Sequence, residues 1–259
     1  MRVRAYAKVN IGLLVGDRRA DGYHELETYM AKVGLFDELE VSIRPARELS
    51  VTLEGNDYLP QGEDLMEKAA RLFSRHWGIS FHLSVRIEKH IPLQAGLGGG
   101  SADAAAVLNA LSVFFSKPLP VELSASVGSD VPFLASGFPC ALAKGRGELL
   151  TPAPAPSGQD VYILVPEERV GTAAAFEALD SIARPRRVLP ALGSSAPTRE
   201  VYPNDFELVY KGKRPEGLLE GPDYCSLSGS GSSWFVITRF LDECLFTSAG
   251  FVLHKTRFI

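Results

Sequence analysis

The chain has 259 residues, of which 46% are hydrophobic and 22% are charged, with a net charge of −4 at pH 7. This length and apolar content predict one large or two ordinary folded domains and exclude a disordered chain. The acidic balance disfavours nucleic acid binding through phosphate contacts, and no uncharged run is long enough to span a bilayer. Three scattered cysteines indicate neither a disulfide framework nor a zinc site, so we expect a cytoplasmic protein.

The N-terminal part of the chain is rich in short segments of strand character. Strands are predicted at Arg2–Val9, Ile11–Val15, Glu27–Val33, Glu38–Arg44 and Leu49–Glu54. A helix is expected over Leu65–His76, because its apolar residues recur at helical spacing. Phe81–Lys89 alternates apolar and polar residues, which is typical of a half-exposed strand and favours an antiparallel or mixed sheet.

A glycine-rich run follows this strand and leads directly into an alanine-rich helix that reaches Phe115. Residues 92–106 read PLQAGLGGGSADAAA, with four glycines in the five positions 96–100 and Ser101 at the expected N-cap position. Glycines let the backbone approach an anion, and the N-terminus of the following helix offers unpaired N–H groups to phosphate. No Lys-Ser/Thr pair follows the last glycine, so the run is not a Walker A loop.

The rest of the chain predicts a second domain after a proline-rich linker. A helix is expected before Asp130, and Pro152 to Gly158 is the best linker candidate. Beyond it we expect strands at Val161–Val165, Trp234–Thr238 and Phe251–Arg257 and a helix at Thr172–Leu179. The predicted division is an ATP-binding, catalytic domain over 1–152 and a substrate-binding domain over 159–259.

Two charged residues stand in otherwise apolar segments. Lys8 lies in the apolar run from Ala5 to Leu14, and Asp130 lies in the segment GSDVPF at 128–133. An unpaired buried charge is costly, so each of these residues needs a partner of opposite charge. From the residues alone, a structural ion pair and a catalytic role are about equally supported.

Residues 92–105 resemble the second motif of the superfamily of galactokinase, homoserine kinase, mevalonate kinase and phosphomevalonate kinase. Two further segments are similar to its first and third motifs, AKVN at 7–10 and SGSGSS at 228–233. Three more segments match the members that phosphorylate 4-diphosphocytidyl-2-C-methyl-D-erythritol: DGYHEL at 21–26, GSDVPF at 128–133 and NDFE at 204–207. The matching segments occur in the right order and cover nearly the whole chain.

The resemblance implies an α+β, two-domain small-molecule kinase fold, with a ribosomal-protein-S5-like N-terminal domain and a ferredoxin-like C-terminal domain. It implies ATP and Mg²⁺ as cofactors, 4-diphosphocytidyl-2-C-methyl-D-erythritol as substrate, Asp130 as general base and Lys8 as the group that polarises the acceptor hydroxyl. The residues implied for ATP are Asp64, Leu65, Met66, Lys89, Pro92, Gly96, Leu97, Gly98, Gly99, Gly100, Ser101 and Ala102. Those implied for the substrate are Asn10, Tyr23, His24, Thr172, Phe176, Gly229, Ser230 and Gly231.

The chain departs from the superfamily pattern at two positions in the expected ATP site. Ala102 replaces a common second serine, and Asp64 replaces the usual asparagine near the adenine. Phe176 also has an alternative role as ordinary core packing with Leu179. Two other functions stay open, another small-molecule kinase of the superfamily and a non-catalytic ligand sensor on the same fold. The sequence leaves the oligomeric state open and assigns no side chain to Mg²⁺.

Overall fold

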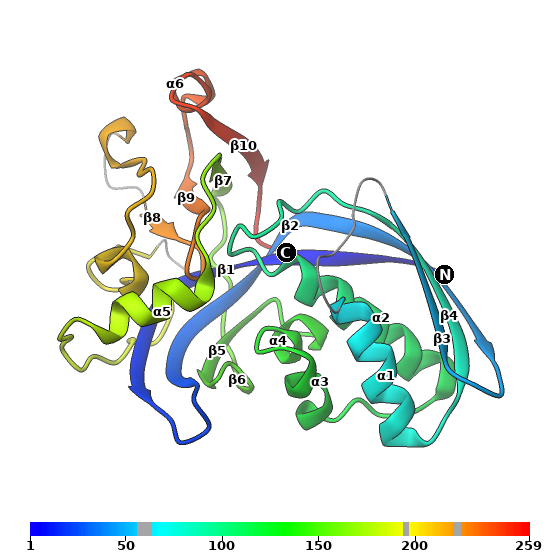
Figure 1. Ribbon diagram of the computed structural model, residues 1–259. Coiled ribbons are helices and arrows are strands. Elements are labelled where there is room, and N and C mark those ends of the chain that lie inside the picture. Colours follow the sequence, from blue (N-terminus) through cyan, green and yellow to red (C-terminus); the bar gives the residue numbers. More distant parts are fainter. Residues whose placement is uncertain (56–63, 194–196, 220–223) are drawn as a thin grey trace. The chain divides into compact units, whose positions relative to one another are not determined.

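The structure is a computed structural model that describes residues 1–55, 64–193, 197–219 and 224–259 (Figure 1). It forms two compact units, of which the first comprises 1–7, 35–93 and 98–137, and the second 8–34, 94–97 and 138–259. These units differ from the expected domains at 1–152 and 159–259, because the first half of the chain also contributes to the second unit. The expected division of labour between an ATP-binding and a substrate-binding domain stays a prediction.

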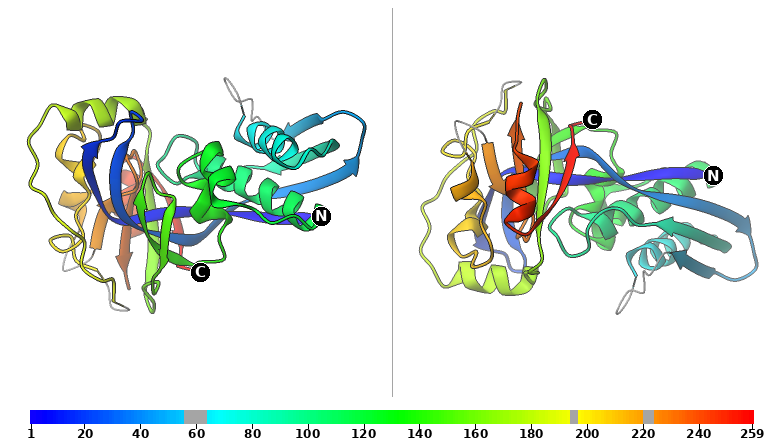
Figure 2. Two further views of the ribbon diagram at one scale, coloured as in Figure 1. Left: turned by 90° about the horizontal axis from the view of Figure 1, so that it is seen from below. Right: turned by 90° about the horizontal axis from the view of Figure 1, so that it is seen from above.

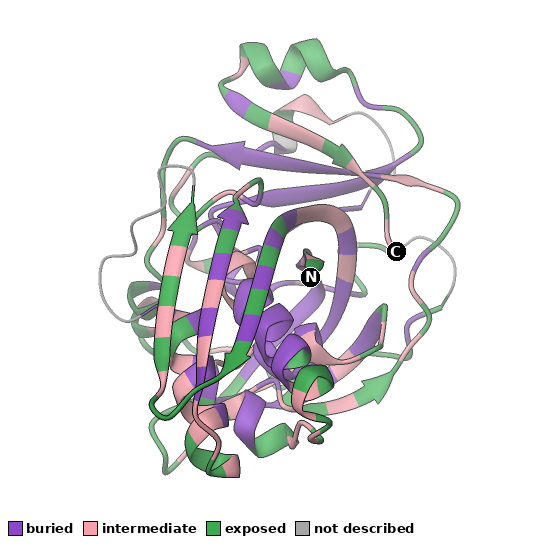
Figure 3. Cartoon of the chain, turned by 90° about the vertical axis from the view of Figure 1, so that its right-hand side faces the viewer, coloured by how far each residue is buried: buried purple, intermediate pink, exposed green. Residues whose placement is uncertain are grey.

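The first unit is built on a mixed sheet whose central strand is β4 (Phe81–Glu88). This strand pairs in parallel with β3 (Ser50–Gly55) and antiparallel with the second half of β2 (His24–Pro45), so that Val85 lies opposite Leu53 and Val41. Buried and accessible residues alternate along β4, and Figure 3 shows the same alternation on neighbouring strands. The predicted half-exposed strand and mixed sheet are therefore confirmed.

Helices pack against this sheet and against one another in the first unit. They are α1 (Leu65–Trp77), α2 (Gly99–Phe115), α3 (Val121–Val127) and α4 (Val131–Ala135). The helices α1 and α2 lie side by side (Figures 1 and 2), and every residue of α2 from Ala102 to Leu108 is buried. Among the residues that the structure describes, no helix is both long enough and apolar enough to cross a membrane.

The second unit contains an antiparallel sheet of four strands in the order β10-β7-β9-β8. These strands are β7 (Asp160–Pro166), β8 (Tyr224–Leu227), β9 (Trp234–Thr238) and β10 (Phe251–Thr256). Helix α5 (Thr172–Asp180) follows β7, and α6 (Glu243–Ser248) follows β9. The resulting βαββαβ order is the expected ferredoxin-like topology.

The second unit also contains most of β1 (Arg2–Arg18), the first half of β2, and the strands β5 (Cys140–Gly145) and β6 (Leu149–Pro152). β2 pairs with both β1 and β5, and β5 pairs with β6. The short helices η1 (Asp205–Leu208) and η2 (Glu216–Leu218) precede β8. Leu13 of β1, Phe206 of η1 and Trp234 of β9 belong to one buried cluster, which ties these elements together.

Several element boundaries differ from the prediction. Arg2–Val9 and Ile11–Val15 form one strand, because Asn10 is buried and hydrogen-bonded within it. Glu27–Val33 and Glu38–Arg44 likewise form the single strand β2. The strands β5, β6 and β8 and the helix α6 were not predicted. Each is only four to six residues long, too short to establish a clear hydrophobic period.

Candidate active site

The second half of the glycine-rich loop forms the start of α2 in the first unit. Gly98 is the N-cap residue, with φ 71° and ψ 21°, and it makes no side-chain cap hydrogen bond. The prediction that Ser101 is the N-cap residue is wrong, because the helix begins at Gly99 and Ser101 lies in its first turn. The first turn therefore presents N–H groups without a side-chain cap, the arrangement that binds phosphate at helix N-termini.

Three residues at the start of α1, Asp64, Leu65 and Met66, are expected to contact ATP. A Cβ added to Gly100 would lie 3.7 Å from Cδ1 of Leu65, so Leu65 is near the glycine loop. Asp64 is the N-cap residue of α1, and its Oδ1 accepts hydrogen bonds from the backbone N–H groups of Met66 at 2.6 Å and Glu67 at 3.3 Å. The Met66 side chain is buried in the core. Contacts of these residues with ATP stay predictions.

The first half of the glycine-rich loop belongs to the second unit, where it packs against residues 228–233. A Cβ on Gly96 would collide with the carbonyl oxygen of Ser228, and the Ser228 hydroxyl donates a hydrogen bond to Gly96 O at 2.9 Å. Ser233 N donates to Ala95 O at 3.2 Å. These contacts bring the second and third motifs together.

Lys8 of the first motif joins the same group of residues in the second unit. Its backbone N–H donates to Leu97 O at 3.0 Å, and its Nζ would lie 3.4 Å from a Cβ added to Gly229. The buried Lys8 ammonium donates to Asn10 Oδ1 at 2.7 Å, and Asn10 Nδ2 donates to Thr28 Oγ1 at 3.0 Å. Both ends of the Asn10 amide are thus engaged within the protein, and Asn10 supports Lys8.

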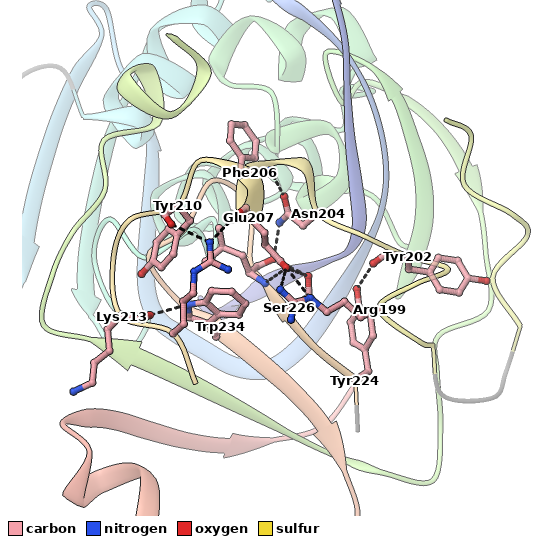
Figure 4. A network of polar contacts seen from close by, with 12 residues as sticks. Arg199, Tyr202, Asn204, Phe206, Glu207, Tyr210, Lys213, Tyr224, Ser226 and Trp234 are labelled. Atoms are coloured by element: carbon pink, nitrogen blue, oxygen red, sulfur yellow. Dashed lines mark hydrogen bonds and ion pairs between the residues drawn. The ribbon is translucent and has the colours of Figure 1, made fainter. Parts of the chain in front are cut away.

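The segment Asn204–Glu207 holds the third motif in place (Figure 4). Asn204 Nδ2 donates to Leu227 O at 2.7 Å and to Gly229 O at 2.9 Å. Glu207 Oε1 accepts hydrogen bonds from Ser226 Oγ at 2.8 Å and from Leu227 N at 3.0 Å. The sequence identified this segment without giving it a role, and the structure assigns it the support of the loop at 228–233.

His24 and Phe176, both expected at the substrate, contact each other. Their rings stack with centroids 4.9 Å apart and an interplanar angle of 14°, and Phe176 also meets Phe206 edge to face. His24 Nε2 lies 2.8 Å from Asp180 Oδ1. Sequence reasoning missed Asp180, although its position four residues after Phe176 places both on the same face of α5.

Tyr23 differs from these two residues because it is exposed in the turn between β1 and β2. The residue is 51% exposed, and the Arg146 guanidinium lies 4.6 Å from its ring centroid. Thr172 Oγ1 and Ser230 Oγ lie 3.1 Å apart, so these two expected substrate residues are also neighbours. Gly231 is held by a backbone hydrogen bond to Ser228 O at 3.0 Å.

Asp130 lies in the first unit, at the N-cap position of α4, and is half-buried. It follows Gly128, where an added Cβ would lie 3.7 Å from Ser101 Oγ, so the turn is next to the first turn of α2. Asp130 and Lys8 belong to different units, and their predicted pairing stays a prediction. Ala102 is buried, Pro92 is half-buried, and Lys89 forms ion pairs with two carboxylates, Asp37 and Asp103.

Comparisons with known proteins identify the family. Residues 64–140 match the model described as GHMP kinases N terminal domain. The 4-diphosphocytidyl-2-C-methyl-D-erythritol kinase of Solibacter usitatus is 34% identical over 92% of this chain and 81% of that protein. The enzyme of the same name from Desulfotalea psychrophila is 35% identical over 91% of this chain and 84% of that protein.

A solved structure gives the same result for the fold. The crystal structure of a 4-(cytidine 5'-diphospho)-2C-methyl-D-erythritol kinase aligns with a TM-score of 0.75 and 32% identity, over 99% of this chain and 98% of that chain. The α+β fold with two sheets and the motifs gathered around Gly96 agree with this match. The chain therefore belongs to the 4-diphosphocytidyl-2-C-methyl-D-erythritol kinase family of the GHMP kinases.

Proposed function

We propose that the chain transfers the γ-phosphoryl group of ATP to the 2-hydroxyl group of 4-diphosphocytidyl-2-C-methyl-D-erythritol. The observation that carries this proposal is the packing of the three motifs, in which Gly96 meets Ser228 and Gly229 lies next to Lys8. The uncapped start of α2 supplies backbone N–H groups for the phosphates of ATP. Family membership supports the choice of acceptor, because the relatives carry this activity in their names.

Asp130 and Lys8 are the proposed catalytic residues. Asp130 accepts the proton of the acceptor hydroxyl as its oxygen attacks the γ-phosphorus atom, and ADP leaves with the electrons of the broken P–O bond. The Lys8 ammonium polarises that hydroxyl and stabilises the charge that develops on the oxygens. The buried Lys8 side chain and its hydrogen bond to Asn10 support this role, because they fix the ammonium in one orientation.

Mg²⁺ is the proposed counter-ion of ATP. In the described ranges, His, Cys, Asp and Glu side chains form no group of three or more that could hold a metal. This fits a cation that is bound mainly by phosphate oxygens and water, as Mg²⁺ in nucleotide sites commonly is. When bound, it would neutralise charge on the β- and γ-phosphates, and the protein residues act on the acceptor.

The remaining residues are proposed to recognise the acceptor in the cytoplasm. Tyr23 and Phe176 stack on the cytosine, and His24 contacts its hydrogen-bonding edge. The hydroxyl pair Thr172 and Ser230 and the backbone of Gly229–Gly231 contact the polar remainder of the molecule, and Asn10 acts on it through Lys8, whose ammonium it binds. The proximity of His24 to Phe176 and of Thr172 to Ser230 supports this grouping.

The experiment that tests the function is a coupled ADP-release assay with the wild-type chain and the Asp130→Asn variant. Loss of the general base should lower kcat by about 10²–10⁴-fold while ATP still binds, because the amide keeps the volume of the carboxylate. Asp17→Asn, on the exposed end of β1, is the matched control and should keep full activity. Turnover of Asp130→Asn within twofold of wild type would remove Asp130 from catalysis.

The same assay separates the two alternative functions. ADP release stimulated by homoserine, mevalonate or a sugar, without a response to the cytidyl acceptor, would identify another kinase of the superfamily. Tight binding of a cytidine nucleotide with no ADP release from any acceptor would identify a ligand sensor. Both outcomes contradict the proposed function.

A further inference from the structure

A buried cluster of three ionisable residues lies in the first unit, directly behind the start of α2. The Lys89 ammonium is 2.5 Å from Asp37 Oδ2 and 2.6 Å from Asp103 Oδ2. The side chains of Asp37 and Asp103 are fully buried, and that of Lys89 is 8% exposed. The cluster is therefore shielded from solvent, and its charges act mainly on one another.

The cluster joins the two ends of the glycine-rich loop. On the entry side, Asp37 Oδ1 accepts hydrogen bonds from His90 N at 2.6 Å and from Ile91 N at 2.8 Å. On the exit side, Asp103 lies in the second turn of α2 and accepts from the Lys89 ammonium. The ammonium thus connects the segment that leaves β4 with the helix that follows the loop.

The first residue of α2 is packed against the same segment. A Cβ added to Gly99 would lie 3.0 Å from Cγ2 of Ile91 and 3.5 Å from Nζ of Lys89. Any displacement of Lys89 or Ile91 therefore moves atoms that touch the helix start. The start of α2 and the segment at 89–91 are thus close-packed.

Stability alone is a weak explanation for this cluster. Removing charges from water is costly, and apolar residues of similar size often stabilise a core as well as a buried ion pair does. In the described structure, Asp103 Oδ1 is buried without a hydrogen-bond partner, which adds to the cost. Charged hydrogen bonds fix the geometry between three separate segments, which apolar contacts do not.

We propose that Asp37, Lys89 and Asp103 form a clamp that fixes the start of α2 for phosphate binding, with Lys89 as a positioning residue that acts through Asp103. The ATP-binding part of this proposal rests on the proposed function. It differs from the expectation that Lys89 contacts ATP itself, because the carboxyl groups of Asp37 and Asp103 already bind its ammonium.

Variants at Asp103 separate the clamp from a direct contact between Lys89 and phosphate. Asp103→Leu keeps the volume but removes the acceptor, whereas Asp103→Asn keeps an acceptor for Lys89. The clamp predicts that Asp103→Leu and Lys89→Met each weaken ATP binding by about 10-fold or more, as small misplacements of binding groups do. Asp103→Asn should stay within about threefold of wild type. Lys117→Met, at the other end of α2, is the control for loss of a lysine charge.

The full-length variants are studied by titration with ATP, by steady-state kinetics and by amide hydrogen exchange of residues 98–104. We expect KM for ATP to rise more than kcat falls, and exchange at the start of α2 to accelerate in Asp103→Leu and Lys89→Met only. In a double-mutant cycle the two effects should not add, because both variants break the same connection. If Asp103→Leu does not fold, Asp103→Ala takes its place.

Three results decide the proposal. Normal ATP binding by folded Asp103→Leu, together with weak binding by Lys89→Met, would overturn the clamp in favour of direct contact. Unchanged hydrogen exchange in both variants would also overturn it. If the wild-type chain does not bind ATP while exchange changes as expected, the clamp is supported as a structural device and the proposed function is wrong.

Discussion

His24 Nε2 and Asp180 Oδ1 lie 2.8 Å apart, with the imidazole stacked on Phe176. An ionised carboxylate can only accept hydrogen bonds, so the contact places a proton on Nε2. In the neutral ring, Nδ1 is then the acceptor. Such a nitrogen can accept a hydrogen bond from the exocyclic amine of cytosine, but not from the carbonyl oxygen at the same position of uracil, which has no hydrogen to donate.

Replacement of Asp180 should therefore relax base selection. In Asp180→Ala the imidazole is free to place its proton on either nitrogen, and discrimination between cytidine and uridine diphosphates should fall by about 10-fold, roughly the effect of one unpaired buried polar group. Competitive binding of the two nucleotides measures this ratio. Glu177→Ala, exposed on the same helix, is the control and should leave the ratio unchanged.

Tyr23 and Phe176 should differ in their effect on stability although both are proposed to stack on cytosine. Replacing either by alanine should weaken acceptor binding by roughly 1–3 kcal/mol. Phe176→Ala should also lower the melting temperature, because the ring packs on Phe206 and the buried cluster of the second unit. Tyr23→Ala should not, since its ring is exposed. Unchanged acceptor affinity in both variants would contradict the stacking proposal.

Gly100→Ala tests the phosphate site without disturbing the fold. Among the described residues an added Cβ meets only Leu65, at 3.7 Å, and alanine is favoured over glycine in a helix by about 1 kcal/mol. The variant should thus be at least as stable as wild type. If phosphate approaches the backbone here, KM for ATP should rise while KM for the acceptor stays the same. Thermal unfolding and kinetics for both substrates provide the two readouts.

Asn204→Ala should loosen the third motif. The change removes the two buried hydrogen bonds that Asn204 donates to Leu227 O and Gly229 O, and each such bond contributes roughly 0.5–1.5 kcal/mol. Both the free energy of unfolding and kcat should fall. Asn204→Asp keeps the cap on η1 but lacks the donors, so it should share the defect. A fully active, less stable Asn204→Ala protein would restrict this residue to a purely structural role.

The cluster at Lys89 predicts a pH dependence of ATP binding. Burial raises the pKa of Asp103 from 3.8 to about 8, with Asp37 raising it further and Lys89 opposing the shift. Asp103 is therefore protonated at neutral pH and gains a buried negative charge as the pH rises through about 8. KM for ATP should increase over this range, because the new charge lies behind the proposed phosphate site at the start of α2.

The stability of the protein should follow the same titration. The contribution of protonated Asp103 is fully present below its unfolded pKa and is lost as the pH rises through its folded pKa. An asparagine at this position cannot ionise, so the Asp103→Asn variant should show a flatter pH profile both of KM for ATP and of the free energy of unfolding. Parallel stability profiles of the two proteins between about pH 4 and pH 8, or parallel profiles of KM for ATP around pH 8, would contradict this assignment.

Much of the first unit could be predicted from sequence because its patterns are long. The helical period of apolar residues in α1 and the apolar-polar alternation in Phe81–Lys89 each reflect one buried face. In these elements the tertiary contacts agree with the structure that the local pattern indicates. The N-cap of α2 could not be predicted from residue preference. Serine is normally favoured at the N-cap, so the sequence predicts Ser101 there. The N-cap is instead Gly98, whose left-handed backbone conformation lets the helix begin before Ser101.

The candidate residues could be named from motifs, but not their partners. Asp37 and Arg146 contact expected site residues from segments far away in the sequence, and no local spacing indicates such contacts. The spacing of Asp180 from Phe176 places both on one face of α5 but does not indicate the contact of Asp180 with His24. The role of Asn204 could not be predicted either, because its partners are also distant in the sequence. Its amide binds carbonyl groups that lie more than twenty residues further along the chain.

The path of the chain through the two units limits how the protein can be divided. The second unit takes residues 8–34 and 94–97 from the first half of the chain, and Gly12 N donates to the hydroxyl of Tyr224 at 3.1 Å. A fragment that starts after Pro152, where the sequence predicts a linker and the structure has the end of β6, would lack β1, β2, β5 and β6, and would expose the residues that these strands cover. The C-terminal half is therefore not a transferable module, and exchange of acceptor specificity between relatives requires grafting onto the intact chain.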